Sequence, residues 1–469
     1  MRTAPLRFRA LRSTEIVCTS DAGTFFKGHA GFASRFAHGA LTAHDTAFLE
    51  SRGDLVEADD GLAWEALAHS VARRISVSSR LNYLILVPTL RCNLSCDYCQ
   101  VSRAAENARG YDWSDDALAH VLGLIDGLET PSIKIEFQGG EPTLRPDLIM
   151  AVINQCARFE HAEFVICTNL QKINNEILAI FDRTDVCIST SLDGSPVDHE
   201  RRRTKAEIHT NEFLANLEML YRRYGPGKIS ALPTIDPRSP PEPAALIDAY
   251  TSFGIHSIFL RPINFQGFAR SRYKESVTTT AAWTNYYEQF VRELIRRNWD
   301  DRTRVLQETY LGICLRRIFK PGLERHVDLR NPNPVGADYL LIDYDGKFYP
   351  SDEARMLARS GVIDLSIGDL WRGIDEERRD LLNRSASNTF DPDCQRCAYQ
   401  PYCGRDVVDD LARYGRIDLP RTQTDFCRKH RSVFDFAFEL IFSADPAVLY
   451  SLCRWLGMPG DAELAEVAP

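Results

Sequence analysis

Runs of apolar residues, many of them β-branched or aromatic, recur at regular intervals from about residue 82 onward. Each run has the usual length of a strand buried in a sheet. Six runs predict strands, over residues 83–87, 133–137, 163–167, 186–189, 228–232 and 257–260. Apolar positions between and after these runs recur every three or four residues, which indicates helices. The helices are expected over residues 114–128, 147–158, 175–181, 210–222, 241–252 and 280–297.

Successive strand–helix units predict a parallel sheet, because parallel strands need a long crossover that a helix supplies. Right-handed crossovers place such strands in an open or closed barrel. We therefore predict an α/β fold with a partial (β/α)6 barrel over residues 81–300. In barrels of this kind the functional residues lie in the loops that follow the strands.

The first 80 residues follow a different pattern. Two short apolar segments, residues 15–19 and 23–27, flank a Ser-Asp-Ala-Gly turn and predict a β-hairpin. Residues 42–51 and 61–74 have helical periodicity. We therefore predict a small α+β module over residues 1–80. Its order of elements is compatible with a winged-helix-like peptide-binding unit and equally with a plain N-terminal extension.

Composition and charge narrow the class of protein. The chain has 469 residues, of which 44% are hydrophobic and 26% charged, as in ordinary globular proteins. A net charge of −9 gives no reason to expect a nucleic-acid partner. The sequence has no signal-peptide core and no apolar run of about 18 residues, so no membrane association is expected. A cytoplasmic location is predicted, where 13 cysteines would serve metals or chemistry rather than disulfides.

Three of these cysteines lie directly after the first predicted strand. Cys92, Cys96 and Cys99 have the spacing C-x3-C-x2-C, and Tyr98 stands just before the last of them. A [4Fe-4S] cluster needs one ligand on each of four irons, and Cys thiolate is the usual one. Three thiols would leave one iron open to another ligand. Structural zinc usually has paired C-x2-C spacings instead, so the loop favours an iron–sulfur cluster.

This loop resembles that of the radical S-adenosylmethionine (SAM) superfamily. In that family the open iron binds the amino and carboxylate groups of SAM, and reductive cleavage yields a 5′-deoxyadenosyl radical that takes hydrogen from a substrate. The resemblance implies that Cys92, Cys96 and Cys99 hold the cluster and that Tyr98 packs near the adenine. It also implies an enzyme, with SAM and a [4Fe-4S] cluster as cofactors and an electron donor of flavodoxin or ferredoxin type.

A second match follows the second predicted strand, where residues 138–142 read Gln-Gly-Gly-Glu-Pro. Glycine allows a close approach of backbones and positive φ angles. In the family this segment binds the amino group of SAM, which implies contacts from Gly139, Gly140, Glu141 and Pro142. By itself the segment would be read as an ordinary turn.

Weaker matches follow the third and fourth predicted strands. Ser191 opens a Ser-Leu-Asp-Gly element that in the family lies near the carboxylate or ribose of SAM. Arg203 ends a His-Glu-Arg-Arg-Arg segment, with Glu where many relatives have Asp, and it is the candidate partner of the SAM carboxylate. Residues 168–169 are a further candidate contact. For each of these positions a helix cap or a loop role is an equal alternative.

Four cysteines near the C-terminus have a second spacing that is typical of a metal site. Cys394, Cys397 and Cys403 form C-x2-C-x5-C, and Cys427 follows. Four thiols can ligate a complete cubane cluster. The region resembles the SPASM domain of radical SAM enzymes that modify peptides, which holds two auxiliary clusters.

The sequence departs from the SPASM pattern at two ligand positions. Ser351 and Val407 stand where the family has cysteines, and Cys314 is left without an evident partner. We therefore predict one auxiliary [4Fe-4S] cluster in a SPASM/twitch-like domain over residues 301–469, which ends in helices. Zinc on the same four thiols is the alternative. The remaining cysteines are expected to be structural residues on apolar faces: Cys18, Cys156, Cys167, Cys187 and Cys453.

The order of modules resembles that of maturases of ribosomally synthesised peptides. Residues 96–103, 139–145 and 401–406 are most similar to the His-Xaa-Ser system radical SAM maturases, whose genes occur beside a second radical SAM maturase and a repeat-containing precursor. This resemblance implies a precursor peptide as substrate and a second maturase as candidate partner. No catalytic acid, base or hydrogen donor can be named. The alternatives are a sulfatase-maturase-like radical SAM oxidase and a non-enzymatic iron–sulfur or zinc protein.

Overall fold

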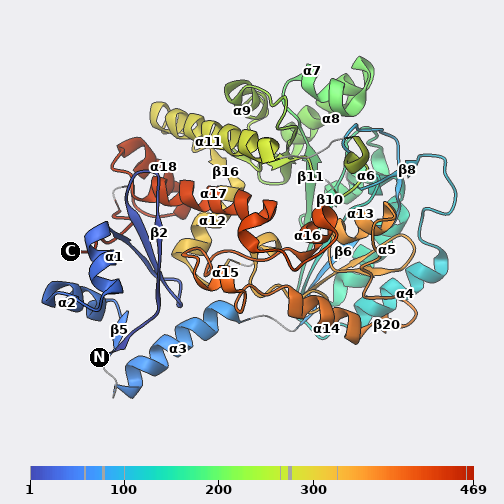
Figure 1. The fold of residues 1–469 in the computed structure, drawn as a ribbon. Coiled ribbons are helices and arrows are strands. Elements are labelled where there is room, and N and C mark those ends of the chain that lie inside the picture. Colours follow the sequence, from blue (N-terminus) through green and yellow to red (C-terminus); the bar gives the residue numbers. More distant parts are fainter. Residues whose placement is uncertain are drawn as a thin grey trace.

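A seven-stranded sheet lies at the centre of one half of the protein in the computed structural model (Figure 1). The structure describes residues 2–56, 60–76, 80–99, 101–264, 266–272, 277–324, 326–460 and 462–469. The strand order is β12-β11-β10-β9-β6-β17-β18, and all neighbours are parallel except β17 and β18. The strands are β6 (Tyr83–Leu86), β9 (Ser132–Phe137), β10 (His161–Cys167), β11 (Val186–Ser191), β12 (Ile229–Leu232), β17 (Tyr339–Ile342) and β18 (Phe348–Tyr349).

Helices between these strands cover the outer face of the sheet (Figure 1). They are α4 (Asp115–Asp126), α5 (Pro146–Gln155), α6 (Asn175–Phe181), α8 (Glu207–Tyr224) and α9 (Pro243–Thr251). Ile135 and Ile166 point from the strands into the same buried cluster as Val121 of α4 and Val152 of α5. Burial of this apolar face is the main force that holds helices and sheet together. The alternation of strands and helices confirms the predicted α/β fold.

The predicted sixth strand forms in two short pieces. β14 (Ser257–Ile258) pairs with β16 (Gln307–Glu308), and β15 (Arg261–Pro262) pairs with β13 (Thr234–Ile235), which continues β12 after Pro233. Pro233 lies between β12 and β13, and the Arg261 and Ile263 N–H groups on either side of Pro262 donate to the carbonyls of Pro233 and Ile235. The opposite edge of the sheet, beside β6, is extended by β17 and β18 from beyond residue 300.

Further elements follow the strands of the barrel and link it to the C-terminal region. They are β7 (Arg91–Cys92), β8 (Ala104–Ala105), η1 (Pro142–Leu144), η2 (Cys156–Arg158), α7 (Pro196–His199), η3 (Glu200–Thr204), α10 (Ala269–Arg272) and α11 (Val277–Asp300). Of these, η3 is a π-helical turn, with wider hydrogen bonding than an α-helix.

The N-terminal module contains the predicted hairpin and both predicted helices, together with four elements that the pattern did not predict. Its antiparallel sheet has the order β2-β3-β4, with β2 (Leu6–Ala10), β3 (Ile16–Ser20) and β4 (Phe25–Gly28). The helices are α1 (Ala30–Ala37), α2 (Ala43–Ser51) and α3 (Gly61–Ile75), and β1 (Arg2–Thr3) pairs with β5 (Leu55–Val56). The unpredicted elements are β1, β2, α1 and β5.

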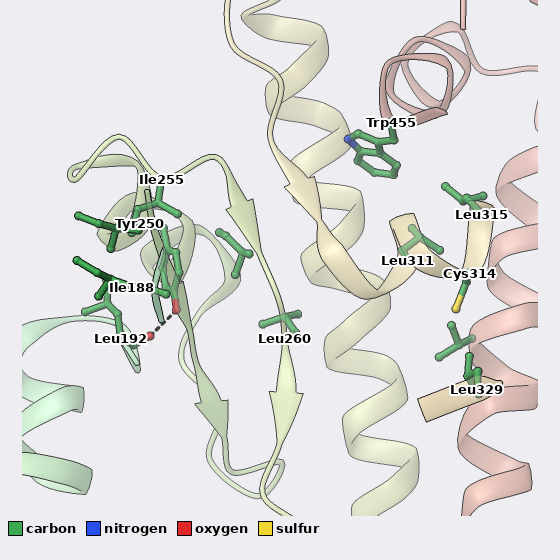
Figure 2. Close-up of a cluster of buried hydrophobic side chains, with 14 of the residues drawn as sticks. Ile188, Leu192, Tyr250, Ile255, Leu260, Leu311, Cys314, Leu315, Leu329 and Trp455 are labelled. Carbon is green, nitrogen blue, oxygen red and sulfur yellow. Dashed lines mark hydrogen bonds between the residues drawn. The ribbon is translucent and has the colours of Figure 1, made fainter. Parts of the chain in front are cut away.

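The C-terminal region adds helices beside the N-terminal module, and both chain ends lie on that side of the molecule (Figure 1). Its other elements are α12 (Thr309–Phe319), η4 (Val327–Leu329), α13 (Asp352–Arg359), β19 (Gly368–Asp369), β20 (Gly373–Ile374), α14 (Glu376–Ser385), α15 (Pro392–Gln395), α16 (Val407–Tyr414), η5 (Arg421–Gln423), α17 (Asp425–Ile441) and α18 (Pro446–Leu456). Figure 2 shows Cys314 among Leu311, Leu315 and Leu329, so this thiol is part of the apolar core.

Among the described residues, no single helix is both long and apolar enough to cross a bilayer. Only α17 and α18 taken together meet that test of length and composition, and they are bent by 112° relative to each other.

Candidate functional site

The loop after β6 brings three thiols together at the carboxyl end of the sheet. Cys92 is the last residue of β7, and its Sγ accepts hydrogen bonds from the Leu94 N–H at 3.4 Å and the Asn169 side-chain amide at 3.7 Å. The Cys99 N–H donates to the Cys96 carbonyl at 3.2 Å. Burial, the nearby Glu141 and the other two thiols raise the pKa of Cys92 to about 12. The predicted ligands therefore lie close enough to act on one another electrostatically.

The glycines after β9 hold this loop from one side. The Gly140 N–H donates to the Thr89 carbonyl at 3.0 Å, and the Glu141 N–H donates to the Arg91 carbonyl at 2.8 Å. A Cβ on Gly139 would lie 2.3 Å from the Thr89 oxygen, and one on Gly140 would lie 2.3 Å from the Arg91 oxygen. No larger residue fits at either position. The close approach that the glycines permit is thus to the cysteine loop itself.

The Glu141 carboxylate joins the loops that follow three neighbouring strands. It accepts from the Thr143 hydroxyl at 2.6 Å and from the Asn169 N–H at 2.7 Å. The Asn169 amide in turn donates to Asn93 Oδ1 at 2.8 Å, beside Cys92. Burial raises the pKa of Glu141, while these hydrogen bonds oppose the shift. The candidate position Asn169 therefore lies next to a predicted cluster ligand.

Tyr98, Asp193 and Arg203 form a buried group on the other side of the cysteine loop. The Tyr98 hydroxyl donates to the Asp193 carboxylate, and Arg203 Nε donates to the same carboxylate at 3.0 Å. The Arg203 guanidinium lies 5.2 Å from the centre of the Tyr98 ring. Burial raises the pKa of Cys96 to about 11, and the charge of Arg203 opposes this shift. Sequence reasoning missed Asp193, although it stands two residues after Ser191 in the same motif.

The π-helical turn η3 closes on the cysteine loop from the same side. The Asp97 N–H donates to the Arg202 carbonyl at 3.0 Å, and the Lys205 ammonium pairs with the Asp97 carboxylate. Lys205 has a positive φ of 63°, which ends the turn and directs the chain away. Turns of this type are frequent at functional sites. No feature of the residue pattern had indicated this contact.

Polar side chains line the inner face of the sheet beneath the cysteine loop. The Glu136 carboxylate accepts from the Tyr83 hydroxyl at 2.7 Å, from the Gln138 side-chain amide at 2.6 Å and from the Cys167 thiol at 3.3 Å. Glu136 has no ion-pair partner in the part of the chain that the structure describes. Ser191 ends β11 on this same face. The sheet therefore presents the Glu136 carboxylate, which is hydrogen-bonded but makes no ion pair within the described residues, toward the interior of the barrel.

Two cysteines of the sheet lie on a different face from the one predicted. Cys167 and Cys187 were expected on apolar faces, but they alternate with the buried Ile166 and Ile188 and share the polar inner face with Ser189. Because successive strand residues point to opposite faces, only one of the two faces can meet the covering helices. The isoleucines take that face, so the cysteines point inward.

The four C-terminal cysteines also converge. Cys394 lies in α15 and Cys427 lies in the first turn of α17, and both thiols act on the pKa of Cys403, which burial raises well above its usual value. The Cys397 N–H donates to the Cys394 carbonyl at 3.0 Å, and the Cys403 N–H donates to the Tyr399 carbonyl at 2.9 Å. Residues 394–403, which we call the auxiliary cysteine turn, thus fold around the thiols.

The two positions where the SPASM pattern has further cysteines serve helices instead. Ser351 is the N-cap of α13, and its hydroxyl accepts from the Ala354 N–H at 3.3 Å. Val407 is the first residue of α16 and is buried in an apolar cluster.

The chemistry of both donor sets fits iron–sulfur clusters. One set offers three thiols on a single loop, and the other offers four, with no carboxylate or imidazole needed to complete either. Across the described ranges, no three His, Cys, Asp or Glu side chains are arranged to hold a single metal ion.

Residues 86–250 match the Radical SAM superfamily. This match confirms the radical SAM domain that the motifs predicted. An uncharacterized protein of Methanocaldococcus jannaschii is 30% identical over 121 residues, which are 25% of this chain and 41% of that protein. The chain therefore spans less than half of the length of this curated relative.

Two solved structures share the fold. The structure of native anSMEcpe with bound AdoMet has 14% identity, a TM-score of 0.61 and coverage of 76% of this chain and 97% of that chain. A structure of anSMEcpe with AdoMet and Cp18Cys peptide has 15% identity, a TM-score of 0.60 and the same coverage. These likenesses confirm the predicted radical SAM fold.

Proposed function

Residues 86–250 form a radical SAM domain, and on this basis we propose that the chain is a radical SAM enzyme that modifies a ribosomally synthesised precursor peptide. The observation that carries the proposal is the packing of the three-thiol loop directly on Gly139 and Gly140, at the ends of neighbouring parallel strands. Both motifs are thereby placed where a barrel of this type has its functional loops.

Cys92, Cys96 and Cys99 would hold a [4Fe-4S] cluster with one iron open to SAM. When bound, the cluster and SAM supply a 5′-deoxyadenosyl radical able to remove hydrogen from an unactivated carbon. The protein's own part is to hold the loop rigid from two sides, through the Gly139–Gly140 backbone and through the turn at residues 200–205. Rigid placement of a reactive group is a large part of what a protein contributes to catalysis.

The candidate SAM contacts surround that loop. Tyr98, fixed through its hydroxyl, would offer its ring to the adenine, and it packs with Ile263 and Ala269. The backbone of Gly139, Gly140, Glu141 and Pro142 would bind the amino group of SAM. Ser191 and Arg203 would meet its carboxylate or ribose, with Asp193 holding Arg203 in position.

A peptide substrate is supported by two observations. The similar protein anSMEcpe was solved with a Cp18Cys peptide. The inner face of this sheet carries Glu136 with three hydrogen-bond donors around it and no ion pair within 4.0 Å among the described residues. A carboxylate in that setting would accept a hydrogen bond from an N–H or ammonium group of the substrate.

Cys394, Cys397, Cys403 and Cys427 would hold one auxiliary [4Fe-4S] cluster. The helix-capping role of Ser351 and the apolar burial of Val407 are consistent with one auxiliary cluster rather than two. Electrons would come from a flavodoxin- or ferredoxin-type protein.

Within the peptide maturases we propose the His-Xaa-Ser type, from the resemblance of the cysteine and glycine motifs. A repeat-containing precursor would be the substrate, and a second radical SAM maturase would act beside this chain.

The test is anaerobic reconstitution followed by iron and sulfide counts and a 5′-deoxyadenosine assay with dithionite. We expect about eight irons per chain, falling to about four in a Cys92/Cys96/Cys99→Ala variant that makes no 5′-deoxyadenosine. Zinc in place of iron, or product from the variant, would overturn the proposal. A synthetic His-Xaa-Ser repeat peptide that keeps its mass while 5′-deoxyadenosine forms would contradict the subgroup alone.

A further inference from the structure

The N-terminal module packs directly on the auxiliary cysteine turn, although the two are almost 400 residues apart in sequence. Arg7 on β2 contacts this turn, as does Thr19 on β3, whose hydroxyl bond is buried. The hydrogen bonds that join them run from Arg7 Nε to the Gln395 carbonyl (2.7 Å), from Thr19 Oγ1 to the Ala398 carbonyl (2.8 Å) and from the Tyr402 hydroxyl to the Gly23 carbonyl (3.0 Å). Each of the three residues that the module contacts, Gln395, Ala398 and Tyr402, is the direct neighbour in sequence of a predicted cysteine ligand.

One carboxylate connects the module to the turn most closely. Arg9 on β2 donates two hydrogen bonds to Asp435 on α17, at 2.9 and 2.7 Å. The Tyr399 hydroxyl donates to the same carboxylate at 2.6 Å. Tyr399 stands two residues after Cys397, and its ring stacks on Phe438 of α17 at 5.7 Å. Arg9 thus fixes the carboxylate that anchors the middle of the auxiliary cysteine turn.

We propose that the N-terminal module is the outer wall of the auxiliary cysteine site and that Arg9 is a positioning residue, which holds Cys397 in place through Asp435 and Tyr399. The proposal rests on the proposed function in one respect, the cluster on the four C-terminal thiols. Groups that orient metal ligands without touching the metal typically change metal affinity by 10- to 100-fold. A change that disorders the N-terminal module would therefore also weaken the binding of iron by the four C-terminal thiols.

The chain offers a matched control one helical turn away. Arg12 donates two hydrogen bonds to Glu439, at 2.9 and 3.0 Å, so it also joins the N-terminal module to α17. Glu439 lies four residues after Asp435 on that helix. In the described part of the chain, Glu439 makes no hydrogen bond to residues 394–403. Arg12→Ala removes the same kind of ion pair between the N-terminal module and α17, together with the Arg12 hydrogen bond to Glu288 of α11 at 2.8 Å, and leaves the auxiliary cysteine turn alone.

The first measurement is iron release to a chelator from full-length protein that carries Cys92/Cys96/Cys99→Ala, so that only the four-thiol site is loaded. We expect release to be at least about 10-fold faster in Arg9→Ala and in Asp435→Asn, and unchanged within about twofold in Arg12→Ala. Arg9→Lys keeps the charge but not the paired donors of the guanidinium. Its iron-release rate should lie between that of the protein with Arg9 and that of Arg9→Ala. Equal release from the Arg9→Ala and Arg12→Ala proteins would overturn the proposal.

A second measurement does not depend on the cluster. Amide hydrogen exchange in metal-free protein should rise across residues 394–403 in Arg9→Ala and stay unchanged in Arg12→Ala. Unchanged exchange in both would overturn the positioning role even if iron binds. If the parent protein binds no iron but exchange rises only in Arg9→Ala, the positioning role stands and the proposed auxiliary cluster fails.

Discussion

Arg203 donates from Nε to the Asp193 carboxylate across 3.0 Å, and the Asp193 side chain has no exposed surface. Burial alone would raise the pKa of Asp193, but the charge of Arg203 brings it below its usual value. The pair also receives the Tyr98 hydroxyl, which fixes the loop that carries Cys96 and Cys99. The electrostatics of the cysteine loop are therefore set by a motif about 100 residues further along the chain.

Arg203→Ala should destabilise the protein far more than Arg201→Ala. Removing Arg203 leaves a buried carboxylate without its cation, which costs about 3–5 kcal/mol. Arg201 belongs to the same turn, but its side chain is 60% exposed and pairs with Asp198 at the surface, a contact of about 0–1 kcal/mol. Urea unfolding of the metal-free proteins measures both. Similar small losses from the two variants would mean that Asp193 is solvated in solution.

Gly140→Ala should abolish the cluster at the first site. Its Cβ would lie 2.3 Å from the carbonyl oxygens of Leu90 and Arg91, and neither backbone can move without displacing Cys92. We expect iron to fall from about eight to about four per chain.

Gly123→Ala is the control for this change. Gly123 lies in α4, and no atom beyond its chain neighbours and the backbone of its own helix lies within 4 Å of the position that an alanine methyl group would take. Alanine should therefore keep all the iron and raise the free energy of unfolding by up to about 1 kcal/mol. Full iron content in Gly140→Ala would contradict the packing described.

We expect the stability of the protein to fall between pH 7 and pH 5 because the buried His199 resists protonation in the folded state. Burial lowers the pKa of His199 from 6.5 to about 4, against the charge of Asp193, and its ring stacks on Phe213 at 4.2 Å. Between these two values the unfolded chain binds more protons, so stability is complete above pH 6.5 and is lost toward pH 4. The loss from this residue at pH 5 is about 2 kcal/mol.

His199→Phe keeps the stacked ring and removes the titration, so its stability should fall by about 2 kcal/mol less than that of the wild type between pH 7 and 5. Parallel stability–pH curves for wild type and His199→Phe would contradict the assignment.

Glu136→Gln should separate SAM cleavage from peptide modification. The amide keeps the shape of the side chain but loses the charge, so a charged hydrogen bond to the substrate is lost, and kcat/KM for the peptide should fall by about 10- to 100-fold. Cleavage of SAM without peptide should not change. Glu163→Gln is the control, because Glu163 lies toward the other end of β10 and pairs with Lys134 at 3.1 Å. Equal peptide kinetics in both variants would remove Glu136 from the substrate site.

The cysteine loop and the glycine segment could be predicted from the sequence because each is a short motif of consecutive residues. The cysteine spacing and the paired glycines each follow a strand, and strand ends meet at one edge of a parallel sheet. The pairing of Arg203 with Asp193 could not be read, because it depends on the π-helical register of residues 200–204. A helix with ordinary hydrogen bonding would turn these side chains differently.

The fold was predictable where the pattern is periodic and less so where distant segments meet. Five of six predicted strands form the main sheet, but the pairing of β17 with β6 joins segments about 250 residues apart. The inward direction of Cys187 was in principle visible, because Val186, Ile188 and Thr190 alternate with it and are buried. The prediction assigned Cys187 to an apolar face because of its residue type. The alternation of buried residues along the strand instead assigns its side chain to the inner face.

Strand β4 gains its last partners from the far end of the chain, with consequences for synthesis on the ribosome. Lys27 exchanges two backbone hydrogen bonds of 2.8 Å with Glu466 and Ala468, and His29 contacts Pro469, 440 residues further on. At ~5–20 residues per second, translation of that interval takes about 20–90 s. During this time the nascent module has an open strand edge, which favours association with other chains. The edge of β4 is therefore covered only after residues 466–469 have been made.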